Sequence, residues 1–239
     1  MHLKRLLVNP VSALLLAACA AFPSAMAHAD TIIWTNWSAS ATTPGGTGSA
    51  TGTAGSIDVS YSGQILGLTN TPSWTPASTF TGGLVGNAPP HTPTIQLQGG
   101  TTLTETISFS STVVDPIFAI WSLGQSGHPA TFDFSSKNGQ SFNLLGGGPS
   151  TEFGGSALTS SGSVVSGTEG NGLVQFMGSF DSITFTTPNP EFYYAFTVGY
   201  DATLTPGIPS TVPEPATLSL FGLGLAALPL VRRSLFRRS

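Results

Sequence analysis

Between residues 31 and 200, apolar side chains recur with a period of two and show no helical period. In the segment TLTETISFS (102–110), apolar residues alternate with hydroxyl side chains, and only Glu105 interrupts the apolar face. This alternation predicts β-strands that bury one face. Strands are predicted at ten segments: 31–37, 56–65, 94–98, 102–110, 116–123, 130–136, 141–145, 172–178, 182–187 and 192–200.

Short strands separated by Gly, Pro, Asn and Ser favour an all-β fold. We expect an antiparallel β-sandwich of jelly-roll type over residues 30–205. The strand at 116–123 is apolar on both faces, so it is predicted to be central and buried on both sides. Two stretches break the pattern. The low-complexity stretch 38–56 is predicted to be a mobile loop or a sheet edge, and 146–172 a long polar connection with one weak strand at 163–166.

The first 29 residues have the three parts of a secretory signal peptide. A Lys-Arg pair precedes an apolar run at 11–22, and Ala27 and Ala29 are the small residues of a cleavage site. The run is shorter than the roughly 20 residues that a membrane-spanning helix needs. We therefore predict a signal peptide at 1–29, removed before Asp30.

An alternative lies in the same stretch. The sequence LAAC, which ends at Cys19, resembles a bacterial lipoprotein box, in which the cysteine carries the lipid. Cys19 is the only cysteine of the chain. Cleavage after Ala29 would therefore leave the exported part without a thiol or a disulfide.

A second apolar run lies near the C-terminus. Residues 216–231 carry no charge, and four arginines follow within 232–239. A helix of these 16 residues would cover about 24 Å of a hydrocarbon core that is about 30 Å thick. We predict a transmembrane helix at 216–231 in the inner membrane, with a basic cytoplasmic tail at 232–239. A Pro-rich spacer at 206–215 joins it to the body.

The order of these C-terminal features matches a known signal. Val212, Pro213, Glu214 and Pro215, then the apolar segment, then the arginines, closely resemble the PEP-CTERM sorting signal of Gram-negative bacteria. The resemblance covers the last 28 residues, and the body resembles no family that we recognise.

The resemblance implies a sorting route. An exosortase-type membrane enzyme would recognise Val212 to Pro215, and Arg232 and Arg233 would stop the chain at the membrane. The protein would be exported, anchored through the C-terminal helix, and then sorted to the cell surface or the extracellular space. Proteins with this signal commonly accompany exopolysaccharide production.

Charge separates the body from the two ends. Residues 30–213 contain one lysine and ten acidic residues, a net charge of −9. A nucleic-acid interface needs basic side chains that neutralise phosphates. We therefore expect no nucleic-acid partner.

The body offers few metal ligands. His91 and His128 have no partner at a zinc-site spacing, so neither a metal site nor a cofactor is predicted. Asp133 with Asn138, or Glu169 with Asn171, could offer oxygen ligands to calcium. The pattern of a calcium loop is missing, however, and ordinary turn roles are favoured.

These patterns favour a non-catalytic protein of the cell surface or extracellular matrix that associates with exopolysaccharide in a biofilm. The alternative is a carbohydrate-active enzyme or a glycan-binding module, and a groove flanked by paired carboxylates would favour the enzyme. Trp37 and Trp74 are candidate glycan contacts, since aromatic faces bind sugar rings; the competing interpretation is that they close the core. Trp34 and Trp37 lie three residues apart, so a regular strand would point them to opposite faces.

Overall fold

The computed structural model describes residues 30–42, 46–135 and 140–204. Fifteen strands and one short 3-10 helix, η1 (Ala77–Phe80), lie in these residues, and all named strand pairs are antiparallel. The first sheet has the order β10 (Phe142–Pro149), β13 (Gly170–Phe176), β8 (Ile117–Leu123), β15 (Tyr194–Asp201), β6 (Thr94–Leu97) and β5 (Gly67–Thr69), with β1 (Ile32–Trp34) also paired to β15.

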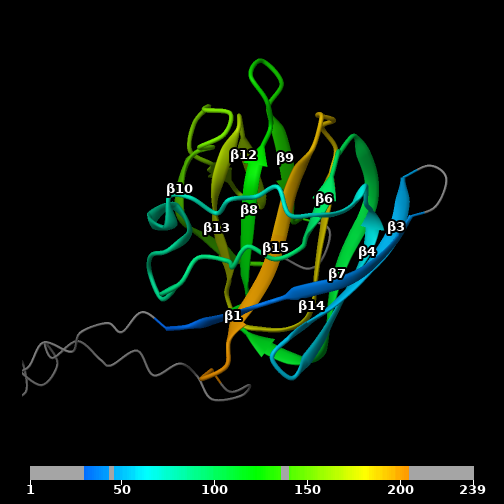
Figure 1. Cartoon of the computed structure of the whole chain (residues 1–239), viewed down its shortest axis with the longest axis vertical. Helices are drawn as coiled ribbons and strands as arrows, with labels where there is room; N and C mark the ends of the chain where they lie inside the picture. Colours follow the sequence, from blue (N-terminus) through cyan, green and yellow to red (C-terminus); the bar gives the residue numbers. More distant parts are fainter. Residues whose placement is uncertain (1–29, 43–45, 136–139, 205–239) are drawn as a thin grey trace, which may run out of the picture. The chain divides into compact units, whose positions relative to one another are not determined.

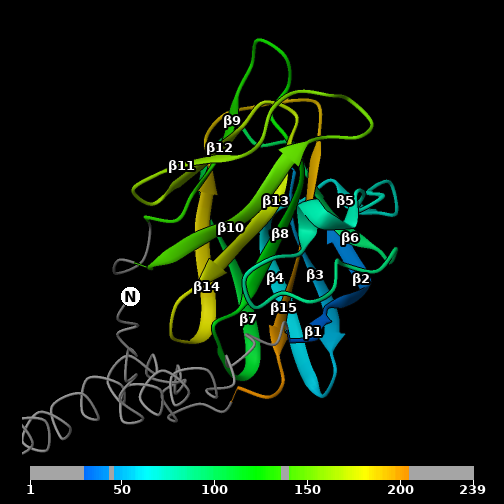
Figure 2. The ribbon, with the colours of Figure 1, turned by 90° about the vertical axis from the view of Figure 1, so that its left-hand side faces the viewer.

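The second sheet has the order β11 (Thr159–Ser161), β12 (Val164–Gly167), β9 (Ala130–Asp133), β14 (Ser179–Thr187), β7 (Thr101–Val114), β4 (Ile57–Gln64), β3 (Thr47–Ala54) and β2 (Asn36–Thr42). From β7 to β10 and from β12 to β15, each strand lies in the opposite sheet from the one before it (Figures 1 and 2). The prediction of an all-β fold with antiparallel sheets is confirmed, and each of the ten predicted segments contains or overlaps a strand.

Of the two structures predicted for the stretch 38–56, a mobile loop or a sheet edge, the structure confirms the sheet edge. The stretch forms most of β2 and all of β3, at one edge of the second sheet. Its small residues suit close strand pairing: a Cβ on Gly52 would lie 2.6 Å from the carbonyl oxygen of Asn36 on β2. Low complexity therefore reflects tight packing here. In the predicted polar connection 146–172, the weak strand is confirmed as β12, but β10 also extends into this stretch and β11 precedes β12.

The main core fills the space between the two sheets. Aromatic rings from both sheets meet in it: Phe118 of β8 stacks on Phe196 of β15 at 4.6 Å and contacts Phe185 of β14 edge-on at 5.6 Å. Such aromatic pairs add about 0.5–1.5 kcal/mol beyond the area they bury. The alternating apolar side chains of the strands thus form a layer of packed aromatic rings between the two sheets.

A second apolar cluster lies on the outer face of the first sheet. It joins Trp121 of β8 to Trp74, Phe80 and Val85 of the connection between β5 and β6. Figure 1 shows this connection crossing in front of β8, β13 and β15. All residues of β8 are therefore buried, as predicted for a central strand.

Glu105, the one polar residue on the apolar face of β7, is fully buried between the sheets. The Thr187 hydroxyl donates to its Oε1, and the Tyr61 hydroxyl lies within hydrogen-bond distance of both its Oε2 and the Gln64 carbonyl oxygen. Tyr61 carries a single hydroxyl proton, so both contacts are satisfied when protonated Glu105 donates to Tyr61 and Tyr61 donates to Gln64. Burial raises the pKa of Glu105 to about 7, against the lowering effect of its hydrogen bonds.

Candidate functional site

The residues predicted to act in export and sorting lie outside the described residues. These are the signal peptide 1–29 with Ala27 and Ala29, the spacer 206–215 with Val212, Pro213, Glu214 and Pro215, the apolar segment 216–231, and the tail 232–239 with Arg232 and Arg233. In the part of the chain that the structure does describe, no helix is both long enough and apolar enough to span a bilayer.

The two tryptophans predicted to contact glycan are buried. Trp37 is 1% exposed, and its Nε1 donates to Thr197 Oγ1 at 3.2 Å. Trp74 is 2% exposed and packs edge-on against Phe80 in the outer cluster. A sugar cannot reach either ring, so the prediction of glycan contact through Trp37 and Trp74 is wrong. Trp34 joins the outer cluster and Trp37 the inter-sheet core, but they lie on different strands, β1 of the first sheet and β2 of the second, so the alternation expected along one regular strand does not apply to them.

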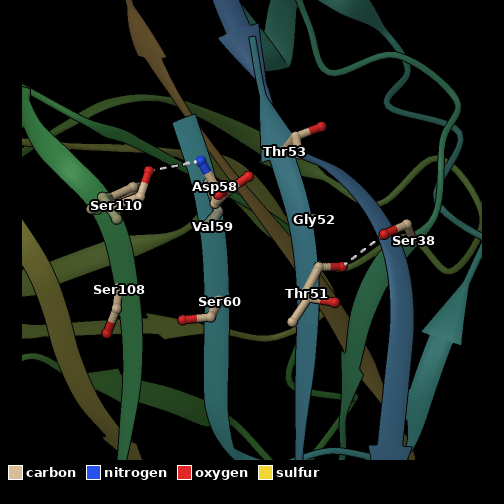
Figure 3. A pocket seen from close by; sticks show the side chains of 10 residues that line it. Ser38, Thr51, Gly52, Thr53, Asp58, Val59, Ser60, Ser108 and Ser110 are labelled. Atoms are coloured by element: carbon tan, nitrogen blue, oxygen red, sulfur yellow. Dashed lines mark hydrogen bonds between the residues drawn. The ribbon is translucent and has the colours of Figure 1, made fainter. Parts of the chain in front are cut away.

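A groove of about 540 Å³ lies over β2, β3, β4 and β7 on the outer face of the second sheet (Figure 3). We call it the hydroxyl-lined groove. Its lining consists of Ser38, Thr51, Gly52, Thr53, Asp58, Val59, Ser60, Ser108, Phe109 and Ser110. Thr51, Ser60 and Ser108 are in register on three neighbouring strands, because the alternation that buries Val59 and Phe109 turns the hydroxyl side chains outward.

Hydrogen bonds hold part of this lining in place. The Ser110 hydroxyl accepts from the Asp58 backbone N–H at 2.9 Å, and the Ser38 hydroxyl donates to the Thr51 carbonyl oxygen at 3.4 Å (Figure 3). The groove thus presents a row of short polar side chains on a rigid sheet.

A second pocket, of about 240 Å³, contains two carboxyl groups. We call it the carboxylate pocket, and its lining consists of Ser122, Gln125, Phe153, Glu169, Glu191, Phe192 and Tyr193. It forms where β8 ends, β13 begins and the chain enters β15. The β8–β9 connection that follows Leu123 is the loop at the top of Figure 1.

Backbone and side-chain hydrogen bonds fix both carboxyl groups. The Ser122 hydroxyl donates to Glu169 Oε2 at 2.5 Å, and the Gly124 backbone N–H donates to Glu191 Oε2. The Glu169 N–H donates to the Gly124 carbonyl oxygen at 3.0 Å. Ser122 and Glu169 have positive φ values of 53° and 54°, a left-handed conformation that costs non-glycine residues about 1–3 kcal/mol each.

The two carboxyl groups differ in their electrostatic surroundings. Burial raises the pKa of Glu191 to about 8; the Gly124 N–H opposes this shift and the nearby charge of Glu169 adds to it. Glu191 is therefore mainly protonated at neutral pH. A protonated carboxyl group can both donate and accept a hydrogen bond, whereas a carboxylate only accepts.

Aromatic rings form the apolar part of this pocket. Phe192 is 80% exposed and Phe153 is 51% exposed. Tyr193 stacks on buried Trp121 at 6.1 Å between ring centroids, and the Trp121 Nε1 donates to Glu152 Oε2 at 3.2 Å. Sequence reasoning had nominated no carboxylate pair. The one local signal was Glu191, which immediately precedes the aromatic run FYY. Its partner in the pocket, Glu169, lies 22 residues earlier in the sequence.

The candidate calcium ligands serve local structure. Asp133 Oδ1 accepts from the Ser135 N–H, and Asn138 lies outside the described residues. Asn171 Oδ1 accepts a hydrogen bond from the Ser122 N–H at 2.7 Å, and Glu169 Oε2 accepts one from the Ser122 hydroxyl. Both side chains therefore bind Ser122. Across the three described ranges, no three His, Cys, Asp or Glu side chains are grouped so that they could hold a metal ion.

Comparison with known proteins identifies one part of the chain. No curated protein and no solved structure matches the chain. Residues 211–238 match the family model of the PEP-CTERM protein-sorting motif. The chain therefore carries a PEP-CTERM protein-sorting motif at 211–238, which indicates export, membrane anchoring before sorting, and processing by an exosortase-type enzyme.

Proposed function

We propose that the protein is a non-catalytic component of the cell surface or extracellular matrix that associates with exopolysaccharide. The observation that carries this proposal is the sorting motif at residues 211–238. In this scheme the signal peptide 1–29 starts export, and the segment 216–231 anchors the chain in the inner membrane until the exosortase-type enzyme acts. The body is then a jelly-roll-type sandwich, in line with the strands that alternate between its two sheets.

The hydroxyl-lined groove is our candidate for the surface that contacts exopolysaccharide, in place of the two buried tryptophans. Ser and Thr hydroxyls both donate and accept, as sugar hydroxyls do, so each can pair with a glycan. A typical hydrogen bond contributes about 1 kcal/mol net, so a row of them is needed for useful affinity. The groove supplies such a row on three strands, around Thr51, Ser60 and Ser108.

The sorting part is tested by removal of residues 211–239 in a host that has an exosortase. We expect the full chain to reach the surface or the medium in a processed form, and the truncated chain to lose membrane retention and this processing. Identical fractionation and identical mature mass for the two proteins would refute this part of the proposal.

The polysaccharide part is tested by co-sedimentation with exopolysaccharide purified from the same host. Ser60→Glu combined with Ser108→Glu places two negative charges in the groove and should reduce the bound fraction. Thr159→Glu combined with Ser161→Glu on β11, at the opposite edge of the same sheet, adds the same two charges and is the matched control. Equal binding by the groove variant, the control and the unchanged protein would exclude the groove as the contact surface.

The second candidate is a carbohydrate-active enzyme, and the observation that favours it is that Glu169 and Glu191 line one pocket. Glycoside hydrolysis commonly uses two carboxyl groups, one kept protonated by its surroundings. Incubation with polysaccharides and assay of new reducing ends tests this function. Release of reducing ends that Glu191→Gln abolishes would support the enzyme and refute the non-catalytic proposal.

A further inference from the structure

We propose that the carboxylate pocket binds one sugar ring of a neutral glycan, with Phe192 and Phe153 against the apolar face of the ring and Glu169 and Glu191 as partners of its hydroxyls. The pocket shares no residue with the hydroxyl-lined groove, and its strands belong to the other sheet. The inference therefore depends neither on the groove nor on the sorting route.

The first argument is the exposure of aromatic rings. Six large apolar side chains are exposed among the described residues, and the two aromatic ones both line this pocket: Leu66, Leu84, Leu103, Phe153, Met177 and Phe192. Exposed apolar surface beside a concave site is typical of ligand binding. Phenyl rings present flat apolar faces, and the C–H face of a pyranose ring is a fitting partner for them.

The second argument is the rigidity of the pocket floor. Trp121 is fully buried beneath the pocket, stacks on Tyr193 and contacts Phe153 edge-on at 5.7 Å. The hydrogen bond from Trp121 to Glu152 fixes the orientation of the indole. A prearranged aromatic floor loses little conformational entropy when a ligand binds, so more of the contact energy appears as affinity.

The third argument concerns the carboxyl oxygens. Both Glu169 and Glu191 use Oε2 for an internal hydrogen bond. Within the described ranges, no protein donor contacts the Oε1 of either residue. One oxygen of each fixed carboxyl group is thus available to a ligand, and sugar hydroxyls are the donors that a pocket of this chemistry would accept.

Two further observations fit a ligand site of this size. Four non-glycine residues of the described chain have a left-handed backbone, and two of them, Ser122 and Glu169, line this pocket. Such strain is concentrated at functional sites. The volume of about 240 Å³ lies just below the ~300–1,000 Å³ of pockets for drug-sized ligands, which suits a single ring.

Charge selects a neutral sugar. No Lys or Arg occurs in the described residues, and the pocket itself holds two carboxyl groups. A uronic acid would bring a further carboxylate close to the charge of Glu169, with no Lys or Arg of the described residues to pair with it, and like charges brought together reduce affinity. We therefore assign the pocket to neutral hexose or pentose units.

The test is a binding assay of the full chain in detergent against an array of neutral glycans (glucans, mannans, galactans and xylans) and of uronate glycans (alginate and polygalacturonate). We expect binding to at least one neutral glycan and weaker binding to the uronates. Phe192→Ala and Phe153→Ala should each weaken the best neutral interaction about tenfold. Phe192 is 80% exposed, so Phe192→Ala should leave thermal unfolding unchanged, whereas Phe153→Ala also loses the edge-on contact with Trp121.

Leu103→Ala is the matched control, because Leu103 is 49% exposed and lies outside the pocket. The double groove variant, Ser60→Glu with Ser108→Glu, separates the two glycan surfaces. Absence of binding to every neutral glycan overturns the inference, as do a preference for uronates and unchanged affinity in both Phe variants. Loss of neutral-glycan binding in the groove variant, with unchanged binding in both Phe variants, would leave the proposed function standing and refute a sugar site in the carboxylate pocket.

Discussion

Replacement of Glu105 by Gln tests whether a protonated carboxyl group lies in the core. Burial raises the pKa of Glu105 from an ordinary value of 4.5 to about 7. The folded state therefore holds a proton that the unfolded chain releases between these two pH values. The stability that this proton contributes is complete below pH 4.5 and is lost as the pH rises to about 7.

The size of the effect follows from the shift. A difference of about 2.5 pH units, at about 1.4 kcal/mol per unit, corresponds to about 3 kcal/mol. Gln does not ionise, and its amide can donate to the Tyr61 hydroxyl while its carbonyl accepts from Thr187. The variant should match the unchanged protein near pH 4.5 and exceed its free energy of unfolding by about 3 kcal/mol at pH 8.

Urea denaturation followed by tryptophan fluorescence at pH 4.5, 6, 7 and 8 measures this difference. Other groups titrate equally in both proteins, so their contributions cancel when the two curves are subtracted. A difference in unfolding free energy that stays constant across the series would refute the reasoning. A variant whose deficit in unfolding free energy grows as the pH rises would show that Glu105 is ionised and required as a charge.

Three further changes probe the core and the carboxylate pocket. Trp37→Ala should lower the free energy of unfolding by about 3–5 kcal/mol, because it empties a buried site between the sheets; a urea midpoint unchanged from the parent would contradict this. Gly124→Ala should destabilise by more than about 1 kcal/mol, because φ is +77° and the new Cβ would lie 2.1 Å from the Gly167 carbonyl oxygen; calorimetry measures the loss. Glu191→Gln should stabilise the protein relative to the parent above pH 8 and have little effect near pH 4.5. The reason is that the raised pKa of Glu191 makes the parent lose stability as the pH rises from 4.5 to about 8. A pH-independent effect in urea titrations would count against a protonated Glu191.

Local sequence determined the strands. Side chains two residues apart share a face of a strand, so a single period of alternation predicts both the element and its buried side. The double-sided apolar pattern of 116–123 predicted a strand covered on both faces, and β8 is covered by the inter-sheet core and by the outer cluster. The sorting motif was also readable, because its match at residues 211–238 depends on contiguous residues.

Sequence reasoning left the low-complexity stretch 38–56 open between a mobile loop and a sheet edge. Ala, Ser, Thr and Gly carry little apolar surface, so their alternation gives a weak signal. Only the neighbouring strands decide that Ala50 and Ala54 face the core and that Gly52 must be small. Glu105 was visible as an exception on its face, but its partners Tyr61 and Thr187 come from strands that only the sheet order brings together.

The sequence by itself determined a two-residue period of apolar side chains, the acidic charge of the body and the C-terminal sorting signal. All three are properties of residues that are close together in the sequence. The tertiary structure alone decided which tryptophans are reachable and which acids meet. Trp37 and Trp74 are buried because separate segments close over them, and Glu169 and Glu191 share a pocket because β13 and β15 both pair with β8. Contacts of this kind depend on the pairing of distant strands, whose free energy is distributed over the whole sheet and leaves no signature in any one stretch of sequence.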